Sequence, residues 1–198
     1  MSKLVVGVSL FFLCLHGPAI ADDSAIMHVG GTIQPMDEHP SVRLVAEHVH
    51  ARIFRKHALV ECVFFLKNEG PPIDVTIGFP NHGGGESSPE LFDSFESYVD
   101  GQRVDVRILE NGDRRPSAWY CKDVRFEAGE LKAIRNVYRG RHSFDTMHDN
   151  WFTYVLHTGA SWLGPIGSVN IVLTFEDFGT DQLWKIEPVS YTHLTLPT

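Results

Sequence analysis

The sequence predicts an all-β protein: a mainly antiparallel β-sandwich of immunoglobulin-like architecture, preceded by a cleaved signal peptide. Two observations predict the sandwich. Apolar and polar residues alternate over most of the chain, which is typical of strands with one buried face. Turn signals rich in glycine, proline, asparagine and aspartate separate these runs about every 8–15 residues, with little helical periodicity between them. A third observation, the composition of the first two dozen residues, predicts the signal.

The start of the chain has the three-part layout of a secretory signal. Lys3 supplies a positive charge, and an apolar run over residues 4–15 follows it. The small-x-small sequence Ala19-Ile20-Ala21 is of the kind that signal peptidase cuts. The run is too short to span a membrane. We therefore expect residues 1–21 to be removed and the rest to be exported to the periplasm or the extracellular space.

The end of the chain looks foreign to the protein. Residues 189–198 (VSYTHLTLPT) match the translation of a transposase mosaic-end sequencing adapter in one reading frame. Such segments are excluded from reasoning about the fold. We expect one β-sandwich domain over residues 22–188, truncated at its C-terminus. A membrane anchor in the missing region stays an open alternative.

Charge and motifs exclude several functions. The net charge of −8 argues against a nucleic-acid partner and against an anionic membrane surface, both of which call for basic patches. The triplet Gly83-Gly84-Gly85 lacks the Lys-Ser/Thr sequence of a phosphate-binding loop. We expect neither a nucleic-acid partner nor a cofactor.

The alternation places the strands along the chain. The tight-turn signal Asp100-Gly101 predicts a hairpin, because both residues tolerate positive φ. Gly112 and Gly129 mark further turns, and residues 83–95 suit a short helix or an irregular loop. The predicted strands cover residues 48–53, 60–67, 74–79, 103–108, 124–126, 131–138, 151–156 and 169–175, with a possible edge strand over 26–33 in an extended lead-in.

Two cysteines follow the predicted signal, Cys62 and Cys121. In an oxidising compartment a disulfide between them is one alternative. Two separate buried thiols are the other, because Cys62 lies in a strongly apolar strand. The sequence cannot choose between them, since it does not give the distance between the two Cα atoms.

His48 and His50 predict the one candidate metal site. They lie on the same face of a strand, roughly 6.5–7 Å apart along the chain. Such a pair binds zinc or copper if a third ligand converges, and His57, Glu61 and Asp74 are nearest in the sequence. A metal-dependent hydrolase is therefore one alternative function. The other interpretation is that the two histidines are polar residues on a solvent-exposed strand face without a metal.

A basic segment over residues 135–141 (RNVYRGR) predicts a strand with two different faces. Arg135 and Arg139 share one face, and Asn136 and Tyr138 share the other. We interpret the arginine side as an outer face whose long side chains cover apolar surface. A surface that binds an acidic polymer or a partner protein is the alternative.

The segment over residues 154–167 (YVLHTGASWLGPIG) stands apart from the rest. It resembles the Tyr-x-Leu-x-Thr-Gly-x-x-Trp-x-Gly-Pro-Ile-Gly block of a group of secreted bacterial proteins, domain-of-unknown-function family 4424. The strand pair over residues 49–79, with its Gly78-Phe79-Pro80 ending, is also similar to that family. The resemblance implies an exported β-rich protein and carries over no catalytic residues.

The same block admits two interpretations. Trp162 can close one end of the sandwich as a buried plug, and the glycines and proline after it fix a turn that leads into the last predicted strand. Alternatively, Trp162 offers a stacking platform for a small ligand or a glycan, with Tyr154 and His157 beside it.

These observations favour a non-catalytic function. We expect an exported module of the cell envelope that binds an envelope protein or a glycan, or that has a structural role. The metal-dependent hydrolase at His48 and His50 and the small-ligand or glycan binder at Trp162 are the alternatives. No catalytic residue is expected, because no nucleophile with a defined neighbourhood accompanies the carboxylates and imidazoles of residues 144–150.

Overall fold

The computed structural model describes residues 4–10, 31–36, 41–81, 91–110, 117–144, 150–152, 154, 162–177 and 193–195. These residues form strands and connecting turns and contain no helix. Consequently none of them belongs to a helix that could cross a membrane. The all-β class predicted from the alternation is confirmed.

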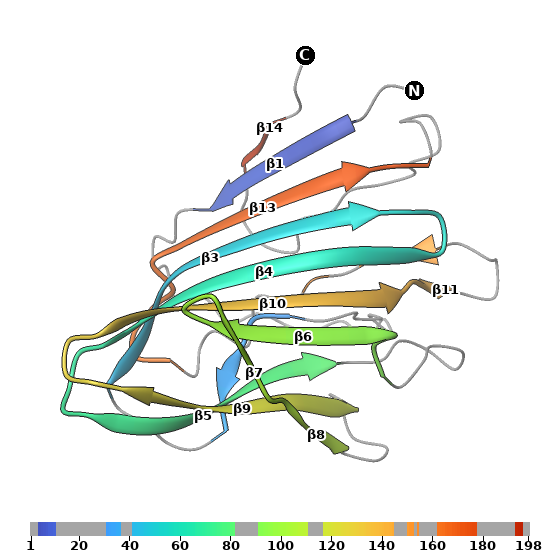
Figure 1. The fold of residues 1–198 in the computed structure, drawn as a ribbon. Coiled ribbons are helices and arrows are strands. Elements are labelled where there is room, and N and C mark those ends of the chain that lie inside the picture. The colour runs from blue at the N-terminus through green and yellow to red at the C-terminus, as the bar shows by residue number, and fades with distance from the viewer. Residues whose placement is uncertain are drawn as a thin grey trace, which may run out of the picture.

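A large sheet contains most of the long strands, which lie side by side in Figure 1. Its order is β14-β1-β13-β3-β4-β10-β6-β7. The strands are β1 (Leu4–Leu10), β3 (Val42–Ile53), β4 (His57–Asn68), β6 (Ser94–Val99), β7 (Gln102–Val104), β10 (Leu131–Arg141), β13 (Ser168–Phe175) and β14 (His193–Thr195). Every pair in it is antiparallel except β13 with β3, which is parallel.

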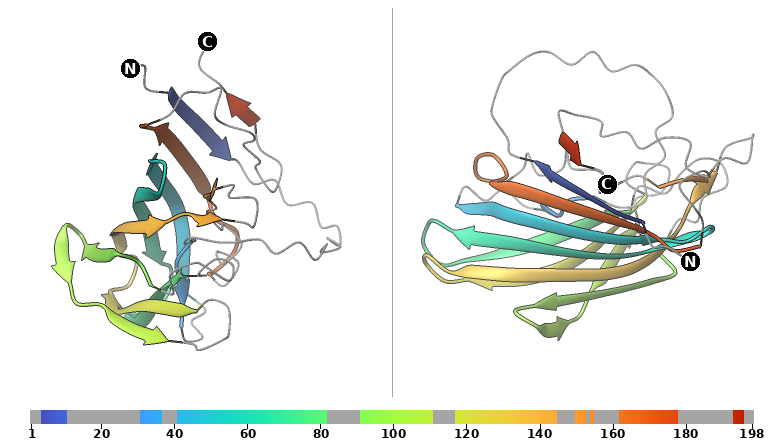
Figure 2. Two further views of the ribbon diagram at one scale, coloured as in Figure 1. Left: turned by 90° about the vertical axis from the view of Figure 1, so that its right-hand side faces the viewer. Right: turned by 90° about the horizontal axis from the view of Figure 1, so that it is seen from above.

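A second sheet of four strands has the order β2-β5-β9-β8 (Figure 1). Its members are β2 (Gln34–Pro35), β5 (Ile73–Asn81), β8 (Arg107–Glu110) and β9 (Ala118–Phe126), all paired antiparallel. A separate short pair joins β11 (Ser143–Phe144) to β12 (Asn150–Trp151). Figure 2 shows the strands of both sheets in two further views. Buried apolar side chains of the two larger sheets belong to one core.

One continuous core fills the space between the two sheets. It takes alternate residues of each long strand, including Val60, Phe64 and Leu66 from the large sheet and Ile77 and Phe79 from the small sheet. All five are at most 1% exposed. This shared interior is consistent with a β-sandwich and is what the period of two predicts.

The hairpin and strand predictions hold in part. Asp100 and Gly101 both have positive φ, at 50° and 81°, and they join β6 to β7 as the tight turn predicted. The single strand expected over residues 103–108 is wrong, because the chain leaves the large sheet after β7 and enters the small sheet at β8. Consequently Ile108, an expected core residue, is 47% exposed at the sheet edge.

Several sequence predictions fall on other parts of the chain. The predicted helix or loop over residues 83–95 lies mostly outside the described residues, and its last two residues begin strand β6. The turn at Gly112, half of the strand over residues 151–156, and residues 26–30 of the lead-in also lie outside them.

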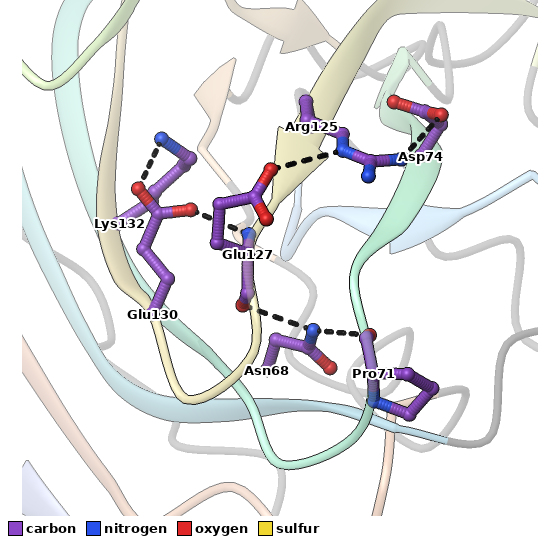
Figure 3. Close-up of polar contacts among 7 residues, drawn as sticks. All are labelled: Asn68, Pro71, Asp74, Arg125, Glu127, Glu130 and Lys132. Atoms are coloured by element: carbon purple, nitrogen blue, oxygen red, sulfur yellow. Dashed lines mark hydrogen bonds and ion pairs between the residues drawn. The ribbon is translucent and has the colours of Figure 1, made fainter.

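Asn68 holds together the corner where two connections cross between the sheets. One connection runs from β4 to β5 and the other from β9 to β10 (Figure 3). The buried Asn68 amide donates from Nδ2 to the carbonyl oxygens of Pro71, at 2.7 Å, and Glu127, at 3.1 Å. Its Oδ1 accepts from the Gly70 backbone N–H at 3.0 Å. One buried side chain therefore hydrogen-bonds three backbone groups of the two connections.

Charged side chains cover the outside of this corner. Arg125 bridges Asp74, at 2.9 Å, and Glu127, at 3.2 Å (Figure 3). Lys132 pairs with Glu130 at 2.8 Å, and Glu130 in turn accepts from the Glu127 backbone N–H. These exposed pairs each contribute little to stability. They fix the two connections in one register beside Asn68.

The first and last described strands fall within segments that the sequence sets apart. Strand β1 pairs with β13 over seven residues and lies inside the predicted signal. Strand β14 pairs with β1 and lies inside the predicted adapter segment. In a chain that lacks residues 1–21, β13 would be the edge of the large sheet.

Candidate functional site

Two of the predicted ligand residues make contacts inside the protein. Trp162 is only 4% exposed, and its indole N–H donates to the carbonyl oxygen of Ile33 at 2.8 Å. The Tyr154 hydroxyl donates to Glu47 Oε1 at 2.7 Å. His157, the third predicted ligand residue, lies outside the described residues. A stacking role for Trp162 stays a prediction, and it would require the indole to leave the core.

Backbone contacts hold the Trp162 loop against the start of β3. The Leu163 N–H donates to the Val42 carbonyl at 2.9 Å, and the Gly167 N–H donates to the Leu44 carbonyl at 3.2 Å. A side chain at Gly167 would collide with the Val45 carbonyl oxygen. The register of β3 shifts at this point through a β-bulge between Leu44 and Ala46. The lack of a side chain at Gly167 therefore allows the backbone of the Trp162 loop to lie directly against the bulge of β3.

Glu47 is the centre of a buried polar group that sequence reasoning missed. Its carboxylate is fully buried and also accepts from the Thr32 hydroxyl at 2.8 Å. Tyr154 interacts with the Cys62 thiol as well. We call these four residues, Thr32, Glu47, Cys62 and Tyr154, the Glu47 cluster. Burial raises the pKa of Glu47 from 4.5 to about 7, although the hydrogen bonds from Tyr154 and Thr32 oppose the shift.

The sequence contained a signal for Glu47. It has the same parity as Val49, Ala51 and Ile53, which all face the core. The alternation therefore predicts an inward carboxylate at this position, on the face opposite the two histidines. Nothing in the sequence indicates that Tyr154 and Thr32 converge on it, because both lie outside β3.

Replacing Glu47 with glutamine should remove one pH dependence of stability. The folded pKa of Glu47 is raised, so its contribution is fully present below about pH 4.5 and declines until about pH 7. We expect E47Q to match the wild-type free energy of unfolding at about pH 4.5 and to exceed it by about 3 kcal/mol at pH 8. Urea unfolding followed by circular dichroism at both pH values measures the difference. Equal stabilities at pH 8 would contradict a carboxylate buried without a cation.

His48 and His50 lie on the outer face of β3, as predicted. The His48 ring lies edge-on to Phe65, with centroids 5.8 Å apart, and His50 Nε2 lies 3.0 Å from the Thr174 hydroxyl. Among the described residues, no group of three or more His, Cys, Asp or Glu side chains is placed to hold a metal ion. The metal-dependent hydrolase therefore finds no third ligand in the described part of the chain.

The three candidates for that third ligand have other partners. His57 stacks on Phe54, with centroids 4.6 Å apart. Glu61 pairs with Arg135 at 3.5 Å, and Asp74 belongs to the corner of Figure 3. Glu61 lies opposite His50 in the β3–β4 register, but its carboxylate pairs with Arg135.

Cys62 and Cys121 are separate free thiols, both buried. Cys62 lies on β4 of the large sheet and Cys121 on β9 of the small sheet. The disulfide alternative is therefore not the arrangement of this structure. Burial raises the pKa of both thiols, and that of Cys62 well above its ordinary value. Neither group has the low pKa of a reactive cysteine.

The outer face of the large sheet collects positive charge. On strands β3, β4 and β10, six cationic side chains point outward, against the single outward carboxylate of Glu61. We call this surface the cationic face; its cations are Arg43, Arg52, Lys67, Arg135, Arg139 and Arg141. The whole chain is acidic, at −8. The cationic face therefore has the opposite sign of charge to the chain as a whole.

Apolar and aromatic side chains occupy the middle of the cationic face. Val63, Phe65 and Val137 are half-buried there. The Arg135 guanidinium lies over the ring of Tyr98, 4.2 Å from its centroid. Strand pairing places Arg135 beside both Val63 and Tyr98, in one row across the sheet. The arrangement confirms the outward arginine side that the sequence predicts for β10.

Comparisons with known proteins agree on the fold. No family model matches the chain, and no curated protein matches it. The solved structure of a "putative nutrient binding protein" from Legionella pneumophila superposes with a TM-score of 0.57 at 18% identity, covering 72% of this chain. It is a likeness of fold alone, and this chain spans about half, 52%, of that protein.

More distant likenesses add no argument. An M1 zinc metallopeptidase from Deinococcus radiodurans superposes over 53% of this chain and 22% of its own, with a TM-score of 0.35 at 13% identity. The resemblance of the Trp162 block to family 4424 stays a prediction. The fold that the comparisons do support is an all-β, mainly antiparallel protein similar to a bacterial protein described as binding nutrients.

Proposed function

We propose that the chain is an exported, non-catalytic binding module of the bacterial cell envelope. Its immunoglobulin-like sandwich would present the cationic face to an acidic surface of a partner protein. The observation that carries the proposal is the surplus of six outward cations over one outward carboxylate on β3, β4 and β10 of an acidic chain. Local charge opposite to that of the partner steers association and fixes orientation.

The centre of the cationic face favours a protein as the partner. Protein interfaces are enriched in tyrosine, phenylalanine and arginine and have an apolar centre with a polar rim. Phe65, Val63 and Tyr98 supply such a centre, and three arginines lie around it: Arg52, Arg139 and Arg141. The net charge of −8 argues against a nucleic acid or an anionic membrane, so neither is the proposed partner.

The ion pairs on this face leave the cations available. Five of the six cations pair with carboxylates of the same chain. Arg43 pairs with Glu69 at 3.9 Å, Arg52 with Glu176 at 2.8 Å and Arg135 with Glu61 at 3.5 Å. Arg139 and Arg141 both pair with Asp93, at 3.5 Å and 3.1 Å. The Arg139 and Arg52 side chains are still 48% and 45% exposed. Pairs of this kind contribute about 0–1 kcal/mol each. A partner's carboxylates can therefore replace the internal ones at little cost.

Export is the sequence-based part of the proposal. The signal over residues 1–21 would send the chain out of the cytoplasm. The resemblance to family 4424 supports an exported bacterial protein. The similar Legionella protein is described as binding nutrients, which is compatible with a binding function and points to no particular ligand here. No cofactor is part of the proposal.

A labelled acidic polypeptide tests the cationic face. We would titrate fluorescein-labelled poly-L-glutamate with the full chain and measure anisotropy at low and at physiological salt. The variant R135A/R139A removes two cations from the cationic face. The control R107A/R125A removes two arginines from the other sheet, where they pair with Asp123 and Asp74, so both variants have the same net charge.

We expect R135A/R139A to bind poly-L-glutamate at least tenfold more weakly than wild type, a loss of about 1.4 kcal/mol. The control should bind within about twofold of wild type, and added salt should weaken all binding. Equal losses in the two variants would overturn the assignment of the face. Binding of an acidic polysaccharide or duplex DNA in preference to poly-L-glutamate would overturn the choice of a protein partner.

A further inference from the structure

Lys122 lies inside the sandwich without a counter-charge among the described residues. It occupies an inward position of β9, between Tyr120 and Val124, and is 2% exposed. Its Nζ donates to Asn136 Oδ1 of β10 at 3.1 Å, so the side chain reaches across from the small sheet to the large one. No carboxylate of the described residues pairs with it, and Cys121 is the only ionisable neighbour that acts on it.

The group around Lys122 has more hydrogen-bond donors than acceptors. The Ser97 hydroxyl of β6 donates to the same Asn136 Oδ1 at 2.8 Å. Asn136 and Ser97 are both fully buried. The Asn136 Nδ2 group is buried and has no hydrogen-bond partner among the described residues. The ammonium group carries three N–H donors and the amide carries two, and one oxygen serves both Lys122 and Ser97.

A negatively charged acceptor would stabilise a buried group of this kind. An unpaired buried donor costs about 1–3 kcal/mol, and an unpaired buried charge costs more. A water molecule would accept from Nδ2 or Nζ, but it would leave a protonated Lys122 without a counter-charge. An anion without hydrogens accepts from both groups and neutralises the ammonium.

We propose that Lys122 and Asn136 form an internal binding site for one small monovalent anion of the size of chloride. The close packing of a protein interior restricts the site to a small ion. Nζ and Nδ2 donate to the anion, while Oδ1 continues to accept from Ser97. The function of the ion is structural: it fastens β9 of the small sheet to β10 and β6 of the large sheet.

Binding of the anion and protonation of Lys122 favour one another. Burial lowers the pKa of Lys122 from 10.5 to about 7, so the amine has lost much of its charge at neutral pH. A bound anion would raise that pKa, because it stabilises the ammonium form. The affinity for chloride is therefore greater at pH 6 than at pH 8.5.

Unfolding in different sodium salts tests the site. We would measure urea unfolding of the full chain in sodium chloride and in sodium gluconate at equal ionic strength, because gluconate is too large for the site. At pH 6 we expect the unfolding equilibrium constant to be at least tenfold lower in chloride, which corresponds to free chloride at roughly ten times its Kd. At pH 8.5 the difference should shrink several-fold. The same equilibrium constant in both salts at pH 6 would overturn the proposal.

Two lysine variants locate the effect. K122M should respond equally to chloride and gluconate, whereas K56M, which removes an exposed lysine, should keep the full response to chloride. A chloride response that persists in K122M would overturn the site.

A crystallographic measurement on the wild-type protein does not depend on either variant folding. Crystals soaked in sodium bromide should show an anomalous peak within about 3.5 Å of Nζ. Water only at that position would contradict the proposal. A bromide peak would also contradict the proposal if the unfolding equilibrium constant is the same in chloride and gluconate. That combination would mean binding at crystal concentration only.

Discussion

Replacing Trp162 with alanine is expected to lower the free energy of unfolding by about 4 kcal/mol. The indole is 4% exposed and belongs to the core cluster, so its removal leaves a large cavity at the end of the sandwich. The substitution also leaves the Ile33 carbonyl oxygen without its donor. The loss of a buried hydrogen bond adds about 1 kcal/mol within this total. Urea unfolding followed by far-ultraviolet circular dichroism measures the change.

Two companion variants separate packing from the hydrogen bond. W162F keeps most of the ring and loses the N–H, so we expect a loss of about 1–2 kcal/mol. L163A changes the neighbouring residue, which is 36% exposed, and should cost less than about 1 kcal/mol. If W162A is as stable as L163A, Trp162 does not close the core, and a ligand-facing role for its loop becomes the better interpretation.

Replacing Lys122 with methionine is expected to raise stability, with a gain that depends on pH. The pKa of Lys122 is lowered from 10.5 to about 7, so unfolding takes up protons between these values and wild-type stability rises with pH across that window. The penalty is fully present below about pH 7. Methionine removes it and fills the space with an unbranched apolar side chain.

In gluconate, which leaves the proposed anion site empty, we expect K122M to exceed the wild type by about 4–5 kcal/mol at pH 6. The advantage should shrink by about 2 kcal/mol at pH 8.5. Urea unfolding at both pH values gives the comparison, and the titration of the cysteines cancels because both proteins contain them. A pH-independent difference would show that the amine is not desolvated. A less stable K122M would show that the ammonium already has a counter-charge.

The two buried ionisable side chains affect stability in opposite directions. Glu47 destabilises the fold as pH rises to about 7, and Lys122 stabilises it as pH rises above about 7. Because the two pH windows meet near pH 7 and do not overlap, wild-type stability should have a minimum near pH 7, whereas E47Q should lose the fall below it and K122M the rise above it. Burying each charge alone is costly. The corner around Asn68 and the Trp162 loop, by contrast, have their buried polar groups paired.

Most of the fold could be predicted from the sequence, because the period of two determines which side chains meet. The strands at Val49, Val60, Val75 and Val169 all appear where the alternation places them. The Asp100-Gly101 turn also follows from residue chemistry alone, since positive φ suits few residue pairs. Pairing partners, such as the parallel contact of β13 with β3, depend on the whole chain and could not be predicted.

The wrong strand prediction and the overlooked buried charges both concern what alternation can predict. Alternation predicts which face of a strand a residue lies on, but not which sheet the strand joins. Residues 103–108 alternate without a break, yet the chain changes sheets after Val104, and Ile108 reaches a sheet edge. Glu47 and Lys122 share the parity of their apolar neighbours, so a strict use of the period would have placed both in the core. Because charged side chains are seldom buried, the sequence analysis did not place Glu47 or Lys122 in the core.

The histidine prediction depends on strand register as well as on the face of each residue. His48 and His50 do share a face, but a metal site also needs ligands from neighbouring strands, and register decides which residues those are. In β4 the residues opposite them are Val63 and Glu61, and Glu61 pairs with Arg135. The same register assembles the cationic face, which no single strand shows in the sequence.

Chemical-shift mapping tests most directly whether this face is where the protein binds. The full chain, labelled with nitrogen-15, would be titrated with poly-L-glutamate and followed through its amide resonances. We expect the largest shifts at outward residues of β3, β4 and β10, including His48, Phe65 and Arg135. Shifts concentrated at residues 162–167 would contradict a binding role for the cationic face, as would a spectrum that the acidic polypeptide leaves unchanged.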